Sequence, residues 1–398
     1  MLDCSKAFDL ARFDILFERL LTDRRVPAIV VRVLSYSYQE QQAWVRWGRG
    51  CTSSTFTISN GTRQGSVASP AFWSVYLDPL FAELRREGVG CHLAGMWMGA
   101  VGYADDIILL APSRAAAQRM LATCEQFAAT NNIRFSTDAN PDKSKSKAIH
   151  VTGLRGGGLQ KPAPLMLCGR ALPWVARAEH LGHALSEDGT MRRDAREKRA
   201  QFIDMSVKIR ETFAFAHPTE QLEAITKYCT SIYGSNLYDF SDAEFEMICN
   251  AWKTGVKLAW DVHRGCRTYL VQQVLAPGIH SLRVNLLVRF RKFFRSLLTS
   301  PSPEVQVAAL LAARDLRSSV GSNLDLLRKE TGLDPWTCSP GQLRAALVQA
   351  EEVSVPPEDA WRVPYVWKLL EERLHHYYCG DNMEEQRVRG LLETLVIN

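Results

Sequence analysis

The sequence predicts an α+β protein in which a small antiparallel sheet, with helices on one face, is followed by an all-helical remainder. Three observations lead to this fold class. Strand-like runs alternate with amphipathic helical patterns up to about residue 190. From about Thr190 the apolar residues keep a helical period to the end of the chain. Two adjacent carboxylates, Asp105 and Asp106, stand at a turn between two apolar runs that have strand character.

Length and charge suggest how the chain divides. The 398 residues are 46% hydrophobic, which is enough for a sizeable core and for two or three domains. We expect an α+β domain over 1–190, a basic helical domain over 191–300 and a further helical region of unknown role over 301–398. Residues 191–300 contain 17 Lys and Arg against 11 Asp and Glu, whereas residues 301–398 contain 10 against 15. A basic middle and an acidic end predict separate surfaces.

The cysteines and the apolar runs limit the class of protein. The ten cysteines include no C-x-x-C pair, which argues against a disulfide framework or a zinc ribbon. Scattered thiols are typical of an intracellular protein. No apolar run approaches the length of a membrane span, and the N-terminus does not resemble a signal peptide. We therefore expect a soluble protein of the cytoplasm or the nucleus, without membrane contact.

Two helices and a hairpin are expected near the start. Apolar residues recur at helical spacing over 10–21, and Pro27 opens a second helix. Alternating and β-branched residues over 42–47 and 55–58 then predict a hairpin.

A polar loop over 59–70 is expected to end in a helix. Ser69 has the residue type of an N-cap, and Pro70 follows at the first helical position. Backbone amides at such a helix start can face an anion. The following helix carries an aromatic stripe, which is typical of a core, and Pro79 should kink or interrupt it.

The two carboxylates lie between residues 96–101 and 107–111, which we interpret as the strands of a hairpin with Ala104 and Asp105 near its tip. The second strand reads as buried on both faces. Like charges held close together are unfavourable unless cations neutralise them, and a divalent metal is a suitable neutraliser. An ordinary Asp-rich turn is the alternative. The tetrapeptide by itself leaves both interpretations open.

The remaining elements follow the same rules. Ser113 should cap a helix with one apolar stripe. A turn with three alternating lysines over 140–147 leads to a short strand over 148–151, followed by a hairpin around 168–170 and a strand at 180–183. Beyond Pro301 and Pro303, helices are expected over 305–313, 324–329, 343–352 and 366–376.

Cations cluster at both ends of the basic region. The residues concerned are Arg192, Arg193, Arg196, Arg289, Arg291 and Lys292. At the second end aromatic residues are interleaved with the cations, which suits a nucleic-acid groove. An amphipathic helix packed on a core is the alternative, and it is favoured more for the aromatics than for the arginines.

Four blocks, in this order, resemble the palm of a reverse transcriptase, most closely that of non-LTR (LINE-type) retrotransposons. They are Asp3-Cys4-Ser5-Lys6-Ala7-Phe8-Asp9; Gly61-Thr62-Arg63-Gln64-Gly65-Ser66 with Ser69-Pro70; Tyr103-Ala104-Asp105-Asp106; and Asn140-Pro141-x-Lys143-Ser144-Lys145. Each block is weak by itself, but four in the family's order are specific. The resemblance covers roughly residues 1–190. It implies a polymerase palm over 1–190, a helical basic thumb over 191–300 and RNA-directed DNA polymerase activity.

The resemblance also implies the chemistry of the site. Asp3, Asp105 and Asp106 would hold two Mg²⁺ ions, with Mn²⁺ possible in their place, and these ions would neutralise charge during phosphoryl transfer. Lys143 would donate a proton to pyrophosphate. The partners implied are an RNA template, a DNA primer and deoxynucleoside triphosphates. The sequence indicates no oligomeric state.

Further residues take their roles from the same resemblance. Phe8 falls where the family keeps an aromatic gate against the 2′-hydroxyl. Arg63, Gln64 and Gly65 would contact the incoming nucleotide. Tyr103 and the six cations of the basic region would contact the nucleic acid through its phosphates.

The chain begins at the first catalytic motif, whereas the family's fingers precede that motif and grip the triphosphate. We therefore expect an N-terminally truncated reverse transcriptase that polymerises poorly or not at all, because positioning of the triphosphate would be lost. The competing class is a catalytically impaired retrotransposon remnant that only binds RNA or an RNA–DNA hybrid, or has no activity.

Overall fold

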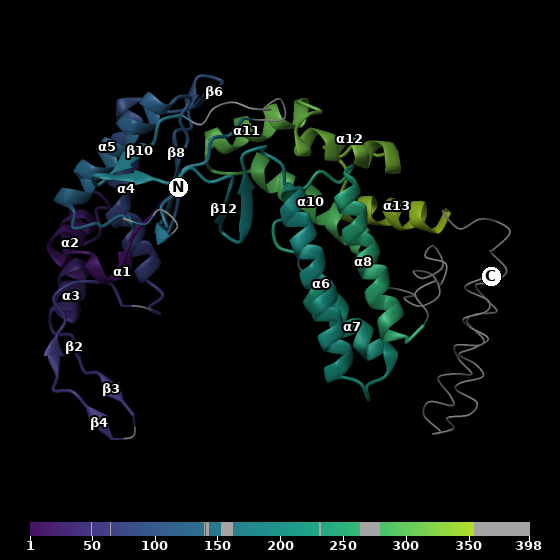
Figure 1. The fold of residues 1–398 in the computed structure, drawn as a ribbon, viewed down its shortest axis with the longest axis horizontal. Coiled ribbons are helices and arrows are strands. Elements are labelled where there is room, and N and C mark those ends of the chain that lie inside the picture. The colour runs from purple at the N-terminus through teal and green to yellow at the C-terminus, as the bar shows by residue number, and fades with distance from the viewer. Residues whose placement is uncertain are drawn as a thin grey trace. The chain divides into compact units, whose positions relative to one another are not determined.

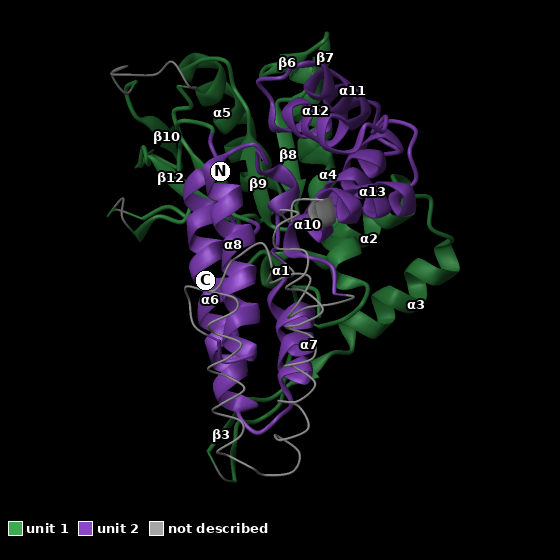
Figure 2. Cartoon of the chain, turned by 90° about the vertical axis from the view of Figure 1, so that its right-hand side faces the viewer, with its two compact units in different colours: residues 1–180, 185–189 green, residues 181–184, 190–398 purple. Residues whose placement is uncertain are grey.

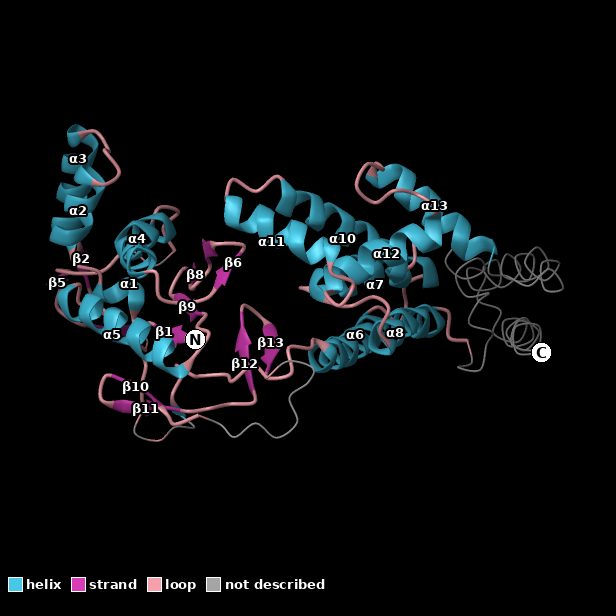
Figure 3. Ribbon diagram, turned by 90° about the horizontal axis from the view of Figure 1, so that it is seen from above, coloured by secondary structure: helices cyan, strands magenta, loops and turns pink. Residues whose placement is uncertain are grey.

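The computed structural model describes residues 1–48, 50–63, 65–138, 140, 143–152, 162–230, 232–262 and 279–353. These residues belong to two compact units, shown in green and purple in Figure 2. Unit 1 contains residues 1–180 and 185–189, and unit 2 contains residues 181–184 and the described residues from 190 onward. Small antiparallel sheets are found in unit 1 and long helices dominate unit 2 (Figure 3). The predicted α+β composition is confirmed.

A three-stranded antiparallel sheet lies at the centre of unit 1. Its order is β1 (Leu2–Asp3), β9 (Asp106–Leu109) and β8 (Ala100–Tyr103), with β9 in the middle. β8 and β9 form the hairpin that the sequence predicts, and the first residues of the chain add the third strand. Ile107 lies opposite Leu2 and is 1% exposed, so the sheet is held to the core by its middle strand.

Unit 1 also contains the helices α1 to α5 (Figure 1). They are α1 (Ala7–Leu10), α2 (Phe13–Thr22), α3 (Ala28–Gln39), α4 (Ser69–Glu87) and α5 (Arg114–Thr130). Ser113 caps α5 as predicted, because its side chain accepts a hydrogen bond from the Ala116 amide. The predicted apolar stripe of α5 is buried as well.

The start and the middle of α4 differ from the prediction. The helix begins at Ser69 itself, and Ala68 takes the N-cap position, while the Ser69 hydroxyl donates to the Arg63 carbonyl oxygen (2.5 Å). Pro79 lies inside the helix and does not interrupt it. An interior proline costs about 3 kcal/mol, and burial of the aromatic and leucine side chains on both sides of it offsets that cost.

Three short antiparallel strand pairs complete the first half of unit 1. Two of them form the predicted hairpin: β2 (Gln42–Ala43) pairs with β5 (Phe56–Thr57), and β3 (Arg46–Trp47) pairs with β4 (Cys51–Thr52). β6 (His92–Leu93) pairs with β7 (Met96–Trp97).

The run 96–101 was predicted as one strand, and the structure divides it between β7 and β8. The Met98 amide donates to the Cys91 carbonyl oxygen, and Gly99 lies so close to the Trp97 ring that a Cβ there would be 2.6 Å from it. The expected burial of residues 107–111 on both faces is also wrong, because Leu110 is 41% exposed.

Two further hairpins follow α5, and they correct two strand predictions. β10 (Leu165–Leu167) pairs with β11 (Arg170–Leu172), as expected. Residues 180–183 are not a strand: Leu181 and Gly182 have positive φ and form the turn between β12 (Arg177–His180) and β13 (His183–Ser186). Residues 148–151 contribute only a single bridge, from Ala148 to Trp174.

Unit 2 consists of helices around one apolar core, as the helical period predicts. The helices are α6 (Arg192–Thr212), α7 (Pro218–Cys229), the short 3-10 helix η2 (Ser235–Leu237), α8 (Ala243–Ala259), α10 (Leu282–Leu298), α11 (Pro303–Arg314), α12 (Ser319–Thr331) and α13 (Pro340–Val353). α6 and α8 lie side by side (Figure 1). Trp252, Phe290 and Leu343 share the core, so described residues on both sides of Pro301 pack together. The predicted helix at 366–376 lies outside the described residues.

In the part of the chain that the structure describes, no helix combines the length and the apolar character that crossing a bilayer requires.

Candidate active site

Carboxylates meet on two neighbouring strands of unit 1 and on the turn beside them. The register of β1 and β9 places Asp3 directly opposite Asp106, and the register of β8 and β9 places Tyr103 opposite the same residue. Asp105 lies in the two-residue turn that joins β8 to β9. The structure therefore places Asp3 and Asp106 at facing backbone positions, with Asp105 next to Asp106 in the chain, although Asp3 is far from both in sequence.

The pKa of Asp3 is affected by burial first and by nearby charges of both signs. Burial raises the pKa of Asp3 above its ordinary value, the nearby charges of Asp105 and Asp106 raise it further, and the charge of Lys145 opposes the rise. A carboxyl whose pKa is raised by neighbouring carboxylates is a physical sign of negative charge that a cation would relieve.

The backbone of Asp3 is fixed from the side opposite β9. Its amide donates to the hydroxyl oxygen of Ser146 (3.1 Å), and its carbonyl oxygen accepts from the Ser136 amide (2.8 Å). Ser146 is fully buried. The two-residue strand β1 is therefore held on both sides, which explains how so short a strand keeps its register.

Two lysines of the fourth block are exposed. The Lys143 amide donates to the Asn140 carbonyl oxygen (3.0 Å). Lys145 follows two residues later, and its charge acts on the Asp3 carboxyl. The role of Lys143 as a proton donor stays a prediction.

Trp73 of α4 contacts the turn that carries Asp105. Its indole N–H donates to the carbonyl oxygen of Ala104 (2.9 Å). The same side chain lies beside Phe8, with ring centroids 5.8 Å apart and planes inclined at 45°. Phe8 is half-buried. The predicted gate residue and the carboxylate turn are thereby linked through one tryptophan.

The polar loop of the second block rests on the segment that contains Phe8. The Thr62 amide donates to the Phe8 carbonyl oxygen (2.7 Å), and the Gly61 amide donates to that of Ala11 (2.8 Å). Gly61 has φ +95, and a Cβ there would come within 3.0 Å of the Asp9 backbone. Only glycine fits this close approach, because both the positive φ and the contact exclude a side chain.

Two of the three loop residues that are predicted to contact the nucleotide lie among the described residues. Arg63 is exposed, its guanidinium lies 5.8 Å from the centre of the Tyr38 ring, and it donates to the Ser37 carbonyl oxygen (3.4 Å). Gly65 has φ +81 and open space where a Cβ would stand. Gln64 lies outside the described residues.

The donor set suits a hard divalent cation, because Mg²⁺ and Mn²⁺ prefer carboxylate oxygens. The raised pKa of Asp3 agrees with a site that gains from such a cation. Within the described ranges, however, no group of three or more His, Cys, Asp and Glu side chains stands close enough to hold a metal ion. Asp3, Asp105 and Asp106 therefore offer the donor type that such a cation prefers, and the described residues do not by themselves form a metal site.

The predicted nucleic-acid contacts on α6 are engaged within unit 2. Arg192 pairs with Asp242 (2.7 Å) and Arg196 with Glu244 (2.6 Å), so both bridge α6 to the start of α8. The remaining cation of this group, Arg193, pairs with a glutamate one turn along its own helix (3.5 Å). All three guanidinium groups are nevertheless exposed enough to meet a ligand.

The cations of α10 divide into surface and core residues. Arg291 is 2% exposed and donates to the carbonyl oxygens of Trp336 (3.0 Å) and Cys338 (3.2 Å). Arg289 donates to the Thr230 carbonyl oxygen (2.7 Å), and burial lowers its pKa. Lys292 is exposed. Because it is buried, Arg291 serves packing, and we leave it out of the proposed nucleic-acid surface.

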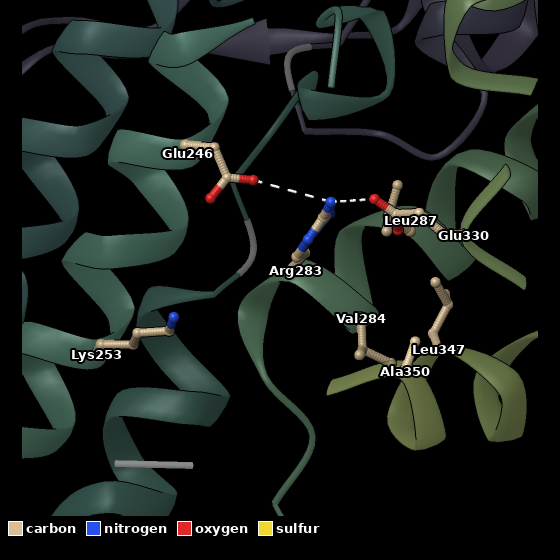
Figure 4. A pocket seen from close by; sticks show the side chains of 8 residues that line it. All are labelled: Glu246, Lys253, Arg283, Val284, Leu287, Glu330, Leu347 and Ala350. Carbon is tan, nitrogen blue, oxygen red and sulfur yellow. Dashed lines mark hydrogen bonds and ion pairs between the residues drawn. The ribbon is translucent and has the colours of Figure 1, made fainter. Parts of the chain in front are cut away.

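A polar pocket of about 350 Å³ in unit 2 was not anticipated from the sequence. Arg283, at the start of α10, lies between Glu330 and Glu246, with the Glu246 carboxylate 3.8 Å away, and Lys253 stands at the rim (Figure 4). Burial raises the pKa of Glu330. The ion pairs of Arg283 connect α10 to α8 and α12. The two cations and the two carboxylates that line the pocket balance in charge, so the pocket has no excess positive charge to attract a phosphate.

An antiparallel sheet that presents carboxylates from neighbouring strands beside a glycine-containing loop suits a polymerase palm, in which phosphoryl transfer relies on positioning and charge neutralisation. Comparison with known proteins supports this interpretation. Residues 1–182 match the family described as reverse transcriptase (RNA-dependent DNA polymerase). The match covers the part of the chain in which the four sequence blocks resemble a reverse transcriptase palm.

Two retrotransposon proteins of Drosophila melanogaster are similar to the chain. A retrovirus-related Pol polyprotein from a type-2 retrotransposable element is 26% identical over 137 residues, which cover 34% of this chain and 13% of the relative. A putative 115 kDa protein in a type-1 retrotransposable element is 28% identical over 132 residues, which cover 33% and 11%. The chain thus matches a small part of each relative. The predicted resemblance to reverse transcriptases of non-LTR retrotransposons is confirmed.

Proposed function

We propose that unit 1 extends a DNA primer on an RNA template by two-metal nucleotidyl transfer. In this reaction the primer 3′-oxygen forms a bond to the nucleotide's α-phosphorus, the bond from that phosphorus to the bridging oxygen breaks, and pyrophosphate leaves. The observation that carries the proposal is the register of β1 and β9, because it sets Asp3 opposite Asp106 with Asp105 in the adjoining turn. Phosphoryl transfer needs such a concentration of oxygen ligands more than it needs covalent chemistry.

The residues have separate roles in this proposal. Asp3, Asp105 and Asp106 would hold two Mg²⁺ ions, or Mn²⁺ in their place. When bound, these ions supply positive charge to the attacking and leaving oxygens. Lys143 would donate a proton to the departing pyrophosphate. Lys145, whose charge already acts on Asp3, would help to neutralise the triphosphate.

The nucleotide would lie between the carboxylates and the polar loop. Phe8 would pack against its sugar and exclude a 2′-hydroxyl, which favours deoxynucleotides. Arg63, Gln64 and Gly65 would contact its phosphates and base. Tyr103, which is 65% exposed at the end of β8, would touch the primer end. The template–primer duplex would run along unit 2 in the role of a thumb, with Arg192, Arg193, Arg196, Arg289 and Lys292 near its phosphates.

Nucleotides and RNA as substrates, together with free thiols at the described cysteines, also lead us to propose an intracellular site of action, in the cytoplasm or the nucleus.

A non-enzymatic role is the second candidate: a retrotransposon remnant that binds RNA or hybrid through unit 2. The observation in its favour is that, among the described residues, no three potential ligands gather around one point. Metal binding separates the two candidates, because the remnant needs no cation.

The proposal is tested by primer extension on a poly(rA) template and by Mn²⁺ titration followed by electron paramagnetic resonance. We expect Mn²⁺ binding that disappears in Asp105→Ala and Asp3→Ala, and we expect DNA synthesis at whatever low level the wild type shows to disappear with it. Asp23→Ala, at an exposed aspartate that ends α2, is the matched control and should change neither. Mn²⁺ binding that persists in Asp3→Ala and Asp105→Ala would contradict the proposal, and RNA binding without Mn²⁺ binding would favour the remnant.

A further inference from the structure

We propose that Trp73 is a positioning residue that fixes the turn carrying Asp105 relative to Phe8. The inference rests on the proposed function, since it concerns the same carboxylates and the same aromatic gate. Trp73 itself does not touch the reacting atoms in this proposal. It would act through the two groups that it contacts.

The turn is held by this contact at a point where its backbone is unusual. Ala104, the first of the two turn residues, has φ +53, a conformation that L-residues other than glycine adopt rarely. The first position of a two-residue hairpin loop with positive φ is usually glycine. The Ala104 carbonyl oxygen accepts the Trp73 indole N–H at 2.9 Å. A side chain from another element thus supports the conformation that orients the next residue, Asp105.

The supporting side chain is itself immobile. Trp73 is 1% exposed and stacks on Tyr76, with centroids 5.7 Å apart and planes inclined at 22°. The Tyr76 hydroxyl donates to the Asn131 carbonyl oxygen (2.5 Å) and accepts from the Arg12 amide (3.3 Å). A close-packed interior resists displacement, so the indole N–H occupies a fixed point. The turn is therefore anchored to the core of unit 1.

The contact between the Trp73 and Phe8 rings connects Trp73 to nucleotide selection, because Phe8 is the proposed gate against the 2′-hydroxyl. Its ring lies 5.8 Å from that of Phe8, whose backbone is in turn bound by the Thr62 amide. The distance between the gate and the carboxylates is then set through one indole. Reactivity in phosphoryl transfer depends on sub-ångström placement, so a small shift here should affect both metal binding and sugar selection.

Trp97 provides a matched control in the same unit. Its indole N–H donates to the Val89 carbonyl oxygen, also at 2.9 Å, but that carbonyl belongs to the connection after α4 and not to the carboxylate turn. Trp73→Phe and Trp97→Phe therefore remove the same kind of hydrogen bond, one at the turn and one away from it.

The test compares the full chain with these two variants by three measurements. We expect Mn²⁺ to bind about tenfold more weakly to Trp73→Phe and with unchanged affinity to Trp97→Phe. Amide hydrogen exchange over residues 103–107 should become faster only in Trp73→Phe. Where primer extension is measurable, the ratio of kcat/KM for deoxynucleotide over ribonucleotide should fall severalfold only in Trp73→Phe.

The readouts distinguish the failure of this inference from that of the proposed function. If the wild type binds no Mn²⁺, the proposed function fails, and exchange over 103–107 still decides whether Trp73 holds the turn. If Trp73→Phe is folded and keeps both wild-type Mn²⁺ affinity and wild-type exchange, the inference is overturned. An equal effect of Trp97→Phe on exchange over 103–107 would also overturn it, because the loss would then be general.

Discussion

Asp3 lies directly opposite Asp106 across β1 and β9, so two carboxylates occupy facing positions of one antiparallel pair. Like charges that face each other across strands destabilise a sheet. The metal-free protein therefore keeps an unfavourable arrangement at the place where chemistry is proposed, and this has measurable consequences for stability.

Replacing Asp106 by Asn should stabilise the metal-free protein. The gain expected from removing a facing like charge is about 0.2–1 kcal/mol in the free energy of unfolding. Urea denaturation near neutral pH in the presence of a chelator measures it. Asp23→Asn, at the exposed end of α2, should give no gain. A loss of stability in Asp106→Asn would show that the carboxylate has another stabilising partner.

A divalent cation should reverse this order of stability, so that the wild type becomes more stable than a variant that lacks one of the carboxylates. A ligand that binds only the folded state at a hundred times its Kd stabilises that state by about 2.7 kcal/mol. The unfolding midpoint of the wild type should thus rise with Mn²⁺, while that of Asp3→Asn should stay nearly constant. Equal shifts in both proteins would point to metal binding elsewhere in the chain.

Lys145→Gln should tighten Mn²⁺ binding, whereas Lys143→Gln should not. The reason is that the Lys145 charge acts on Asp3 and repels a cation placed there. At exposed positions such a repulsion amounts to about 1 kcal/mol or less, which is up to about fivefold in affinity. Titration at pH 8 and low salt gives the comparison. An identical effect of the two substitutions would mean that only net charge matters.

Arg291 and Lys292 are neighbours on α10 with opposite expected effects. Arg291→Met should cost about 1–3 kcal/mol of stability, because two buried carbonyl oxygens lose their donor, and should leave the salt dependence of RNA binding unchanged. Lys292→Met should barely affect stability and should reduce the salt slope by about 1 if the lysine meets a phosphate. Binding isotherms at several salt concentrations, with thermal unfolding alongside, measure both.

Glu330 should make stability fall as pH rises. Its folded pKa is raised by burial, so the folded state binds the proton more tightly than the unfolded state. The stabilisation is complete below the ordinary glutamate pKa of about 4.3 and is lost as pH rises through the raised value. Between pH 4 and 7 the unfolding free energy of Glu330→Gln should therefore decline less than that of the wild type. Glu179→Gln, at a largely exposed glutamate, should retain the wild-type slope.

The sequence predicted the elements whose signals are local. The cap at Ser113, the stripe of α5 and the hairpin around Ala104 follow from residue type and period, and the structure contains all three. Strand β1 could not be predicted in this way, because two residues have no period. Its register depends on pairing with β9 and on the Ser146 hydroxyl, which lie far along the chain.

The residues of the candidate site could likewise be predicted only where they belong to a recognisable motif. The three carboxylates came from the motif order, while Trp73 and Ser146 gave no distinct signal and Lys145 stood in the fourth block without an assigned role. Trp73 belongs to an aromatic stripe that any core helix could show, and Lys145 belongs to a run of lysines typical of a solvated surface. Arg291 has the residue type of a phosphate contact, and only its burial reveals a packing role. Contacts between distant segments decide such roles, and a local pattern does not contain them.

The fixing of Asp3 by Ser146 also has a consequence for synthesis. The first carboxylate of the site leaves the ribosome long before the residue that holds its amide. At the usual rates of about 5–20 residues per second, the nascent chain would carry an unplaced Asp3 for on the order of ten seconds. Nascent chains that end before Ser146 should consequently lack a complete site, however well their helices have formed.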